Sequence, residues 1–449
     1  MSADLESAGA SELARAVAAR EVSAVELCEA CIDRIEARNP AVNAVVVKDY
    51  DRALDAARLA DAAVARGETG PLLGVPMTVK EAFNVEGLVT TWGLESARDW
   101  IAPEDAEVVK RLKAAGAVIV GKTNVPPNLG DWQSANPVYG RTVNPHDATR
   151  SPGGSSGGSA AALATGMVPL EFGSDIGGSI RVPSAFCGTV GHKPSFGLVP
   201  IEGHAPPGAV GNPPPLGVVG PMARRVEDLE LALQVTAGPA GMDAVGYRLD
   251  LPSPRADRLE DFRVLVLDDH PAAPVDAEIR AAIQGVARRL RAAGADVAEH
   301  SNRLPDIAAQ HATYMPLLMT AMSHGGPPSP QTPSAHAFMD LQNAQLAWRR
   351  RWAELFESFD VVLAPTLGTV AFPHIEGGDW ADRTLTIDGQ PQPFSGQLLW
   401  ASIATLPNLP STAVPIGKTR GALPIGAQVL GPYLEDRTTL AFARLLLDA

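Results

Sequence analysis

Two clusters of glycine and serine contain the residue types that a hydrolytic site needs. The first is GGSSGG at residues 153–158, and the second is DIGGS at residues 175–179. Because glycine has no Cβ atom, it adopts backbone conformations closed to other residues and lets amide N–H groups converge on one point. A serine hydroxyl beside such amides combines a nucleophile with hydrogen-bond donors for an oxyanion. The pattern therefore predicts serine chemistry at Ser155 and Ser179.

Three other interpretations fit the first cluster less well. Gly- and Ser-rich tracts are often flexible linkers, but this tract continues into the Ala-rich run 159–165 rather than into polar sequence. A phosphate-binding P-loop needs Lys and then Ser or Thr after its last glycine, whereas Ser159 and Ala160 follow here. The G-x-S-x-G pattern of a nucleophile elbow is present, but the elbow needs a buried strand before its serine, and residues 144–152 are polar and broken by prolines.

A third reactive group ends an apolar run. Residues 75–79 are mostly apolar and are followed by Lys80. The ordinary interpretation is a solvated lysine at a strand end, because lysines are rarely buried without a partner. If the run is a buried strand, desolvation lowers the lysine pKa from its usual value of about 10.4 and makes a neutral amine available near pH 7. Lys80 is therefore the candidate base.

Taken together, these blocks resemble the amidase signature family. The resemblance is carried by GVPMTVK at residues 74–80, GGSSGG at 153–158, DIGGSIR at 175–181 and GHKP at 191–194. Weaker blocks extend it along most of the chain. It is weakest over residues 243–340, the region where family members differ in substrate.

The resemblance implies a Ser–cis-Ser–Lys mechanism. Ser179 would be the nucleophile, and Lys80 would be the base. Ser155, joined to Gly154 by a cis peptide bond, would relay the proton between them. The family usually has Asp after the base lysine, whereas this chain has Glu81, so the hydrogen bonds around that position are open.

Further groups are expected around the nucleophile. The candidates for the oxyanion hole are the amides of four consecutive residues, Ile176, Gly177, Gly178 and Ser179. The expected supporting side chains are Ser156, Asp175 and Arg181, and a purely structural ion pair is the alternative for Arg181. The expected substrate pocket contains Trp132, Gln133, Met315 and Met319, for which core packing is the alternative.

The expected function is hydrolysis of carboxylic amide bonds through an acyl-enzyme, with carbamates, aryl amides and esters as further substrate classes. An alternative is the catalytic subunit of a tRNA-dependent glutamine amidotransferase. A third is a silent binding protein, but such a protein has no reason to keep Lys80, Ser155 and Ser179 together. A small-molecule amide or carbamate is the expected partner. No cofactor or metal is expected, since the nine histidines lack a ligand spacing such as H-E-x-x-H.

The elements that must position these groups indicate an α/β fold. Helical periodicity covers residues 11–18, 23–38 and 51–65, and the second helix opens with the capping box Ser23-x-x-Glu26. A strand at 262–267 followed by a helical run is typical of parallel pairing. The resemblance implies one domain over residues 1–449: a large twisted mixed sheet, mainly parallel, with helices on both faces. Residues 243–340 would be a variable, substrate-facing region within it.

The composition limits partners and compartment. A net charge of −14 and a pI near 5.1 oppose a nucleic-acid-binding surface. Three cysteines, Cys28, Cys31 and Cys187, cannot form a disulfide framework and are expected as buried packers in a reducing compartment. The start lacks a signal-peptide pattern, and no run of 18 apolar residues occurs. We therefore expect a soluble cytoplasmic protein with no membrane contact, for which a homo-oligomer is allowed.

Overall fold

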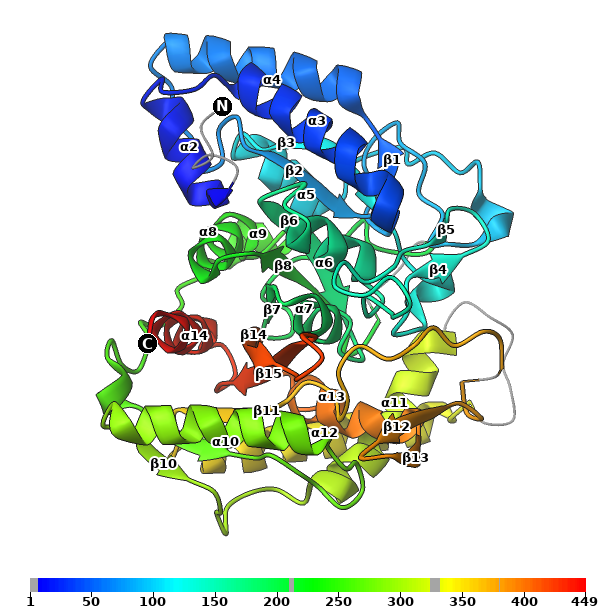
Figure 1. Cartoon of the computed structure of the whole chain (residues 1–449), viewed down its shortest axis with the longest axis vertical. Coiled ribbons are helices and arrows are strands. Elements are labelled where there is room, and N and C mark those ends of the chain that lie inside the picture. The colour runs from blue at the N-terminus through cyan, green and yellow to red at the C-terminus, as the bar shows by residue number, and fades with distance from the viewer. Residues whose placement is uncertain (1–6, 210–213, 324–331, 379) are drawn as a thin grey trace.

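An eight-stranded sheet crosses the middle of the computed structural model, which describes residues 7–209, 214–323, 332–378 and 380–449 (Figure 1). Its strand order is β10-β9-β11-β15-β14-β7-β8-β6. β6, β8, β11 and β15 are buried along their whole length, so this sheet is the centre of the core. The strands are β6 (Leu170–Asp175), β7 (Val190–Lys193), β8 (Val218–Ala223), β9 (Arg263–Val266), β10 (Asp296–Ala298), β11 (Val361–Pro365), β14 (Ser411–Lys418) and β15 (Pro424–Leu430).

The sheet is mixed, but most of its pairs are antiparallel. β9 pairs in parallel with β10 and with β11. The pairs that link β11, β15, β14, β7, β8 and β6 are antiparallel. The predicted mixed sheet is confirmed, and the prediction that it is mainly parallel is wrong for these strands. Parallel neighbours need a crossover, which α10 (Ala277–Ala292) provides between β9 and β10, whereas β14 and β15 follow each other directly.

A three-stranded sheet adjoins the large one. Its order is β1 (Val45–Lys48), β3 (Val118–Thr123) and β2 (Pro76–Lys80). β2 is parallel to β3 and lies beside β6 of the large sheet. Lys80 is the last residue of β2, so the strand delivers its side chain to the junction of the two sheets.

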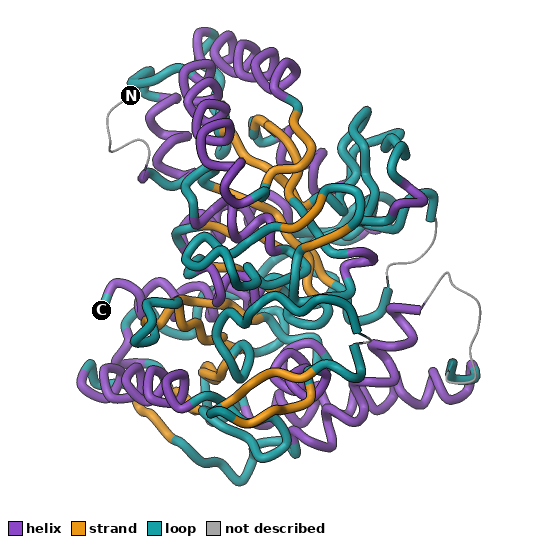
Figure 2. The backbone as a smooth tube through the Cα atoms, turned by 45° about the vertical axis from the view of Figure 1, so that its right-hand side comes forward, coloured by secondary structure: helices purple, strands orange, loops and turns teal. Residues whose placement is uncertain are grey.

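Helices cover both faces of the large sheet, as predicted (Figure 2). On β7, a Cβ at Gly191 would lie 2.4 Å from Ser184 Oγ of α7 (Arg181–Cys187). The next residue, His192, faces the other way, and its Nε2 lies 3.1 Å from Asp436 Oδ1 of α14 (Asp436–Asp448). Because successive strand residues point to opposite faces, α7 and α14 lie on opposite sides of the sheet.

Three N-terminal helices gather over the small sheet (Figure 1): α2 (Ala10–Ala18), α3 (Ala24–Val42) and α4 (Tyr50–Ala65). The predicted capping box is confirmed, since Ser23 Oγ accepts from Glu26 N at 3.1 Å and Ser23 N donates to Glu26 Oε2 at 2.8 Å. The sequence predicts that α3 ends before Asn39, but the helix continues to Val42. The buried Asn39 side chain explains this end, because its Oδ1 accepts from the amides of Ala44 and Val45, just beyond the helix.

The region predicted as variable, residues 243–340, supplies β9, α10, β10, α11 (Ile307–Ser323) and the start of α12 (Ala335–Leu355). Residues 324–331 of that region lie outside the described residues. No helix in the described ranges is both long and apolar enough to cross a membrane. The other elements are α5 (Glu107–Ala114), β4 (Ala135–Asn136), β5 (Gly140–Arg141), α6 (Gly157–Ala164), α8 (Val226–Thr236), α9 (Asp243–Gly246), β12 (Thr384–Ile387), β13 (Gln390–Pro393) and α13 (Leu398–Thr405).

Candidate active site

The Lys80 side chain is completely buried at the end of β2. Its Nζ donates to Ser155 Oγ at 2.6 Å and to Ser174 Oγ at 2.9 Å. Burial lowers the pKa of Lys80 to about 7, against the opposing effect of the Asp175 and Glu171 carboxyls. Near neutral pH a large fraction of this amine is therefore uncharged and able to accept a proton.

The two predicted serines lie on adjoining segments. The Gly154–Ser155 peptide bond is cis, as the resemblance implied. Ser156 N donates to Ser179 O at 3.2 Å, which holds the two serine segments side by side. The Ser179 hydroxyl makes no hydrogen bond to the described residues. The structure thus contains the Lys80–Ser155 contact but not a hydrogen bond between the Ser155 and Ser179 hydroxyls.

A tight turn between β6 and α7 precedes Ser179. Gly178 has φ +93°, a conformation that favours glycine. The Gly178 amide donates to Asp175 Oδ1 at 2.9 Å, so the prediction that it is a free oxyanion donor is wrong in this state. The Asp175 carboxylate, just before the turn, accepts this hydrogen bond, so the Gly178 amide already has a local partner. Within the described residues, the amides of Ile176, Gly177 and Ser179 have no acceptor and are available.

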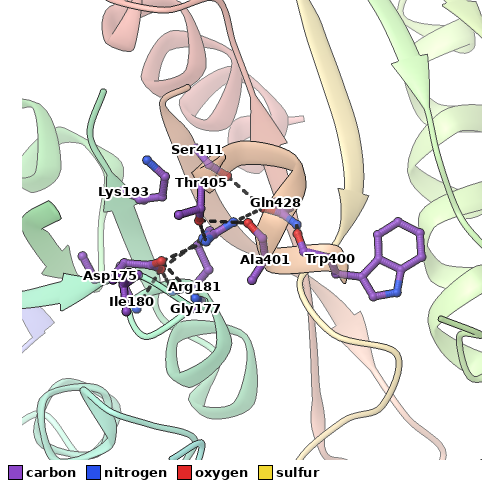
Figure 3. Close-up of polar contacts among 12 residues, drawn as sticks. Asp175, Gly177, Ile180, Arg181, Lys193, Trp400, Ala401, Thr405, Ser411 and Gln428 are labelled. Carbon is purple, nitrogen blue, oxygen red and sulfur yellow. Dashed lines mark hydrogen bonds and ion pairs between the residues drawn. The ribbon is translucent and has the colours of Figure 1, made fainter. Parts of the chain in front are cut away.

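Arg181 and Asp175 form a buried ion pair behind this turn (Figure 3). Arg181 donates to both Asp175 oxygens, at 3.0 and 2.8 Å. Its other contacts reach Gln428 Oε1 at 2.8 Å and Thr405 Oγ1 at 2.9 Å. Burial alone would raise the pKa of Asp175, but the Arg181 guanidinium lowers it to about 2. The pair joins the turn to α13 and β15, so both residues support the loop rather than face a substrate.

Ser156 also lies behind the site. It is fully buried, and its Oγ is 3.4 Å from both the amide and the carbonyl of Ser174, the second acceptor of the Lys80 amine. The hydroxyl therefore links the first serine cluster to β6, in keeping with its expected supporting position.

Trp132 and Gln133 lie near the site in different ways. The buried Trp132 ring packs on Phe394, with ring centroids 5.0 Å apart, and its Nε1 donates to Gly177 O at 2.9 Å. Gln133 Oε1 accepts from Ile375 N at 2.9 Å, and its Nε2 donates to Ile375 O at 3.3 Å. The Gln133 amide thus binds the segment after β11, whereas Trp132 contacts the glycine turn before Ser179.

The two methionines predicted in the substrate pocket differ in their exposure to solvent. Met315 packs against a buried apolar cluster that also includes Trp132, Tyr314 and Leu398. Met319, one turn further along α11, is 58% exposed. Met319 lies outside the buried face of α11, which contains Tyr314, Leu317 and Leu318, so its place in the substrate pocket stays a prediction.

Three residues near the site were not predicted. Ser174 is the second acceptor of the Lys80 amine. Glu171, fully buried on β6, hydrogen-bonds to Thr78 of β2, and burial raises its pKa to about 7. Tyr314 Oη donates to Ile176 O at 2.7 Å. A signal existed for the first two, since Glu and Ser interrupt an otherwise apolar strand, but nothing in the sequence marked Tyr314.

Glu81, the departure from the usual family pattern, is fully accommodated. Its buried carboxylate accepts from Thr91 N at 2.5 Å, Trp92 N at 3.0 Å and Tyr139 Oη at 2.9 Å. These partners differ from those of Lys80 Nζ, whose acceptors are Ser155 and Ser174. The longer side chain therefore braces the loop after β2. The described residues contain no group of three His, Cys, Asp or Glu side chains that could hold a metal ion.

Comparison with known proteins extends over nearly the whole chain. The Amidase family model matches residues 26–327 and 320–440. A glutamyl-tRNA(Gln) amidotransferase subunit from Acidothermus cellulolyticus is 34% identical, covering 95% of this chain and 91% of the relative. The crystal structure of a bacterial aryl acylamidase of the amidase signature family has 27% identity and a TM-score of 0.85, covering 98% of this chain and 96% of the other. A structure from a vestigial protein complex, linked to the origins of an s-triazine catabolic enzyme, has 29% identity and a TM-score of 0.84, covering 98% of each chain.

Proposed function

The chain belongs to the amidase signature family, and from this premise we propose that it cleaves carboxylic amide C–N bonds through an acyl-enzyme on Ser179. The observation that carries the proposal is the Lys80 amine, fully buried and 2.6 Å from Ser155 Oγ. A base is most effective when its pKa lies near the working pH. The pKa of about 7 for Lys80 meets that condition.

The nucleophile would lose its proton in two transfers. Lys80 Nζ takes the proton of Ser155 Oγ, and Ser155 Oγ takes the proton of Ser179 Oγ. The second transfer needs the Ser179 hydroxyl to turn about its Cα–Cβ bond towards Ser155 when substrate binds. Catalytic hydrogen bonds are often incomplete before substrate binding, so this adjustment is ordinary for such a site.

Ser179 Oγ then attacks the amide carbon, and the carbonyl oxygen becomes an oxyanion near the amides of Gly177 and Ser179. The C–N bond breaks as the leaving nitrogen takes a proton from Ser155, which Lys80 reprotonates. The amine departs and the acyl group remains on Ser179. Water, deprotonated along the same path, attacks this ester and releases the carboxylic acid.

Apolar side chains beside the oxyanion loop support apolar or aryl amides as substrates, with aryl carbamates and esters as related classes. A Cβ at Gly177 would lie 3.2 Å from Leu398 Cδ2, and one at Gly178 would lie 3.0 Å from Val182 Cγ2. Both side chains belong to the cluster that contains Trp132 and Phe394. Burying an apolar group against such a wall contributes about 25 cal/mol per Å².

The test is a substrate panel with the purified full-length chain: anilides, primary amides, esters, aryl carbamates and glutamine. Ser179→Ala and Lys80→Met should each lose at least about a thousandfold in kcat/KM. Ser184→Ala is the matched control, because its buried hydroxyl has no hydrogen-bond partner in the described structure. A fluorophosphonate should label the parent at Ser179, as mapped by mass spectrometry. Activity of Ser179→Ala equal to the parent would overturn the proposal.

The names of the curated relatives favour a second candidate, one component of a glutamyl-tRNA(Gln) amidotransferase. Glutamine carries both an ammonium and a carboxylate, which need opposite charges in the site. A charged pair beside the apolar cluster, Arg383 and Asp131, is joined through one carboxylate oxygen, with Nη1 2.6 Å from Oδ2, while Asp131 Oδ1 is buried without a hydrogen-bond partner among the described residues. In the same panel, this candidate predicts glutaminase activity that requires partner subunits, whereas the hydrolase cleaves anilides alone.

A further inference from the structure

Two buried aromatic side chains donate hydrogen bonds to consecutive carbonyl groups of the loop before Ser179. Tyr314 Oη donates to Ile176 O at 2.7 Å, and Trp132 Nε1 donates to Gly177 O at 2.9 Å. Tyr314 is fully buried and Trp132 is 2% exposed. One side chain comes from α11 and the other from the loop after β3, so two distant segments hold the same turn.

These contacts fix the directions of the following amides. In a trans peptide unit, the C=O group and the next N–H group point in opposite directions in one plane. The contact at Ile176 O therefore orients the Gly177 N–H, and the contact at Gly177 O orients the Gly178 N–H. The second amide is already bound to Asp175 at 2.9 Å. The first has no acceptor among the described residues and is free for an oxyanion.

We propose that Tyr314 is a positioning residue that aims the Gly177 amide at the oxyanion formed during attack by Ser179. This inference rests on the proposed function. Without the phenol, the 176–177 peptide can rotate more easily, because Gly177, on one side of it, has no Cβ. A donor that is held in place before the reaction stabilises developing charge more than one that must reorient.

The chemistry of the side chain supports this role over packing alone. Tyr314 lies in a cluster with Leu317, Leu318 and Leu398, where a phenylalanine ring would pack as well. The hydroxyl adds a buried polar group, which destabilises the fold unless it finds a partner. Its partner here is a carbonyl of the catalytic loop rather than a structural helix or strand.

The test uses Tyr314→Phe in the full-length protein, which removes one oxygen and keeps the ring. With para-nitrophenyl butyrate, an activated ester, and with a para-nitroanilide, kcat should fall about tenfold and KM should change less than about twofold, since direct removal of an oxyanion donor has a larger effect, about 10²–10³. Phenylboronic acid, which forms a tetrahedral adduct on the serine, should bind more weakly by the same factor as kcat.

Two variants of α11 serve as controls. Thr313→Val removes the acceptor of Trp348 Nε1, 3.0 Å away, but does not touch the loop. Ile307→Ala, at the start of α11 and in the other buried cluster, leaves a cavity and lowers stability without loss of a loop contact. Both should keep the parental kcat and boronate affinity. If Ile307→Ala loses kcat as Tyr314→Phe does, or if Tyr314→Phe keeps the parental values, the inference is wrong. An active Ser179→Ala would instead overturn the proposed function.

Discussion

The Lys80 amine is fully buried, which is rare for a lysine, and its surroundings explain how it can act as a base. Its hydrogen bonds go to two neutral hydroxyls, Ser155 and Ser174, rather than to a carboxylate. The nearest carboxyls, Asp175 and Glu171, act only through space and partly offset the effect of burial on its pKa. A direct ion pair would keep the amine charged, so this arrangement favours the neutral form.

The pH dependence of kcat/KM should therefore have an acidic limb with a midpoint near the Lys80 pKa of about 7. Burial raises the pKa of Glu171 to about 7, so this carboxyl is negative above that pH and then stabilises the ammonium. Glu171→Gln should therefore move the midpoint to lower pH while the plateau is retained. His204, another titratable group beside Lys80, has a pKa lowered to about 3 by burial and by Lys80 and does not titrate in this range. Glu230→Gln on α8 is the control, and a midpoint unmoved in Glu171→Gln would contradict the expectation.

The same buried amine should make the native protein less stable. Its pKa falls from 10.5 in the unfolded chain to about 7 in the folded one. Between these values the unfolded state binds more protons, so this group's contribution to stability rises with pH and is least favourable below pH 7. Lys80→Met should be more stable at about pH 6 by a few kcal/mol, less the effect of two unpaired serines, and the gain should shrink towards about pH 10.

Urea unfolding at the two pH values measures that gain. Lys418→Met, at the exposed end of β14, is the control and should show no such pH-dependent difference. A Lys80→Met protein less stable than its parent at low pH would mean that the two serine contacts outweigh the burial of the amine.

The junction of β6 and α7 fixes the conformation of the DIGGSIR segment, residues 175–181. Asp175 ends the strand, and its carboxylate accepts from the amides of Gly178 and Ile180 at 2.9 and 3.0 Å. Arg181 starts the helix and returns to the same carboxylate. Strand end, turn and helix start are thus tied to one charged centre, so the turn is rigid despite its glycines.

Arg181→Met should destabilise the protein by about 3–5 kcal/mol, because it leaves the Asp175 charge buried without its partner. The double variant with Asp175→Asn should recover part of this loss, since no uncompensated charge remains. Chemical denaturation of the two variants and the parent measures the difference. If Arg181→Met loses less than about 1 kcal/mol, the pair contributes no more than a surface ion pair does.

These elements also mark what the sequence could predict. The glycine and serine clusters and the capping box of α3 depend on neighbours within a few residues, so their conformations follow from local chemistry. The direction of strands such as β6 and β8 does not, because a strand buried on both faces has the same apolar pattern whichever way its neighbour runs. The role of Tyr314 could not be predicted either, because its partner, Ile176 O, is distant in the sequence.

At the scale of the molecule, early and late parts of the chain meet in one sheet. β6, β7 and β8 form one end of the sheet, the later strands form the other, and β14 pairs with β7 where the two groups meet. The active site follows the same rule, since α13 and β15 contact Arg181 from more than two hundred residues away. We therefore propose that the whole chain is a single folding domain rather than two independent units.

A single domain should unfold in one cooperative transition. Calorimetry of the full chain should give one peak whose calorimetric and van't Hoff enthalpies agree. A fragment of residues 1–240 ends before β14 and would expose the buried edge of β7, an unpaired strand that favours aggregation. We expect this fragment to be insoluble or unfolded alone, as judged by circular dichroism and gel filtration. Two separate calorimetric peaks, together with a folded fragment, would instead show that the N-terminal half is stable without β14, and the sheet would then join two domains.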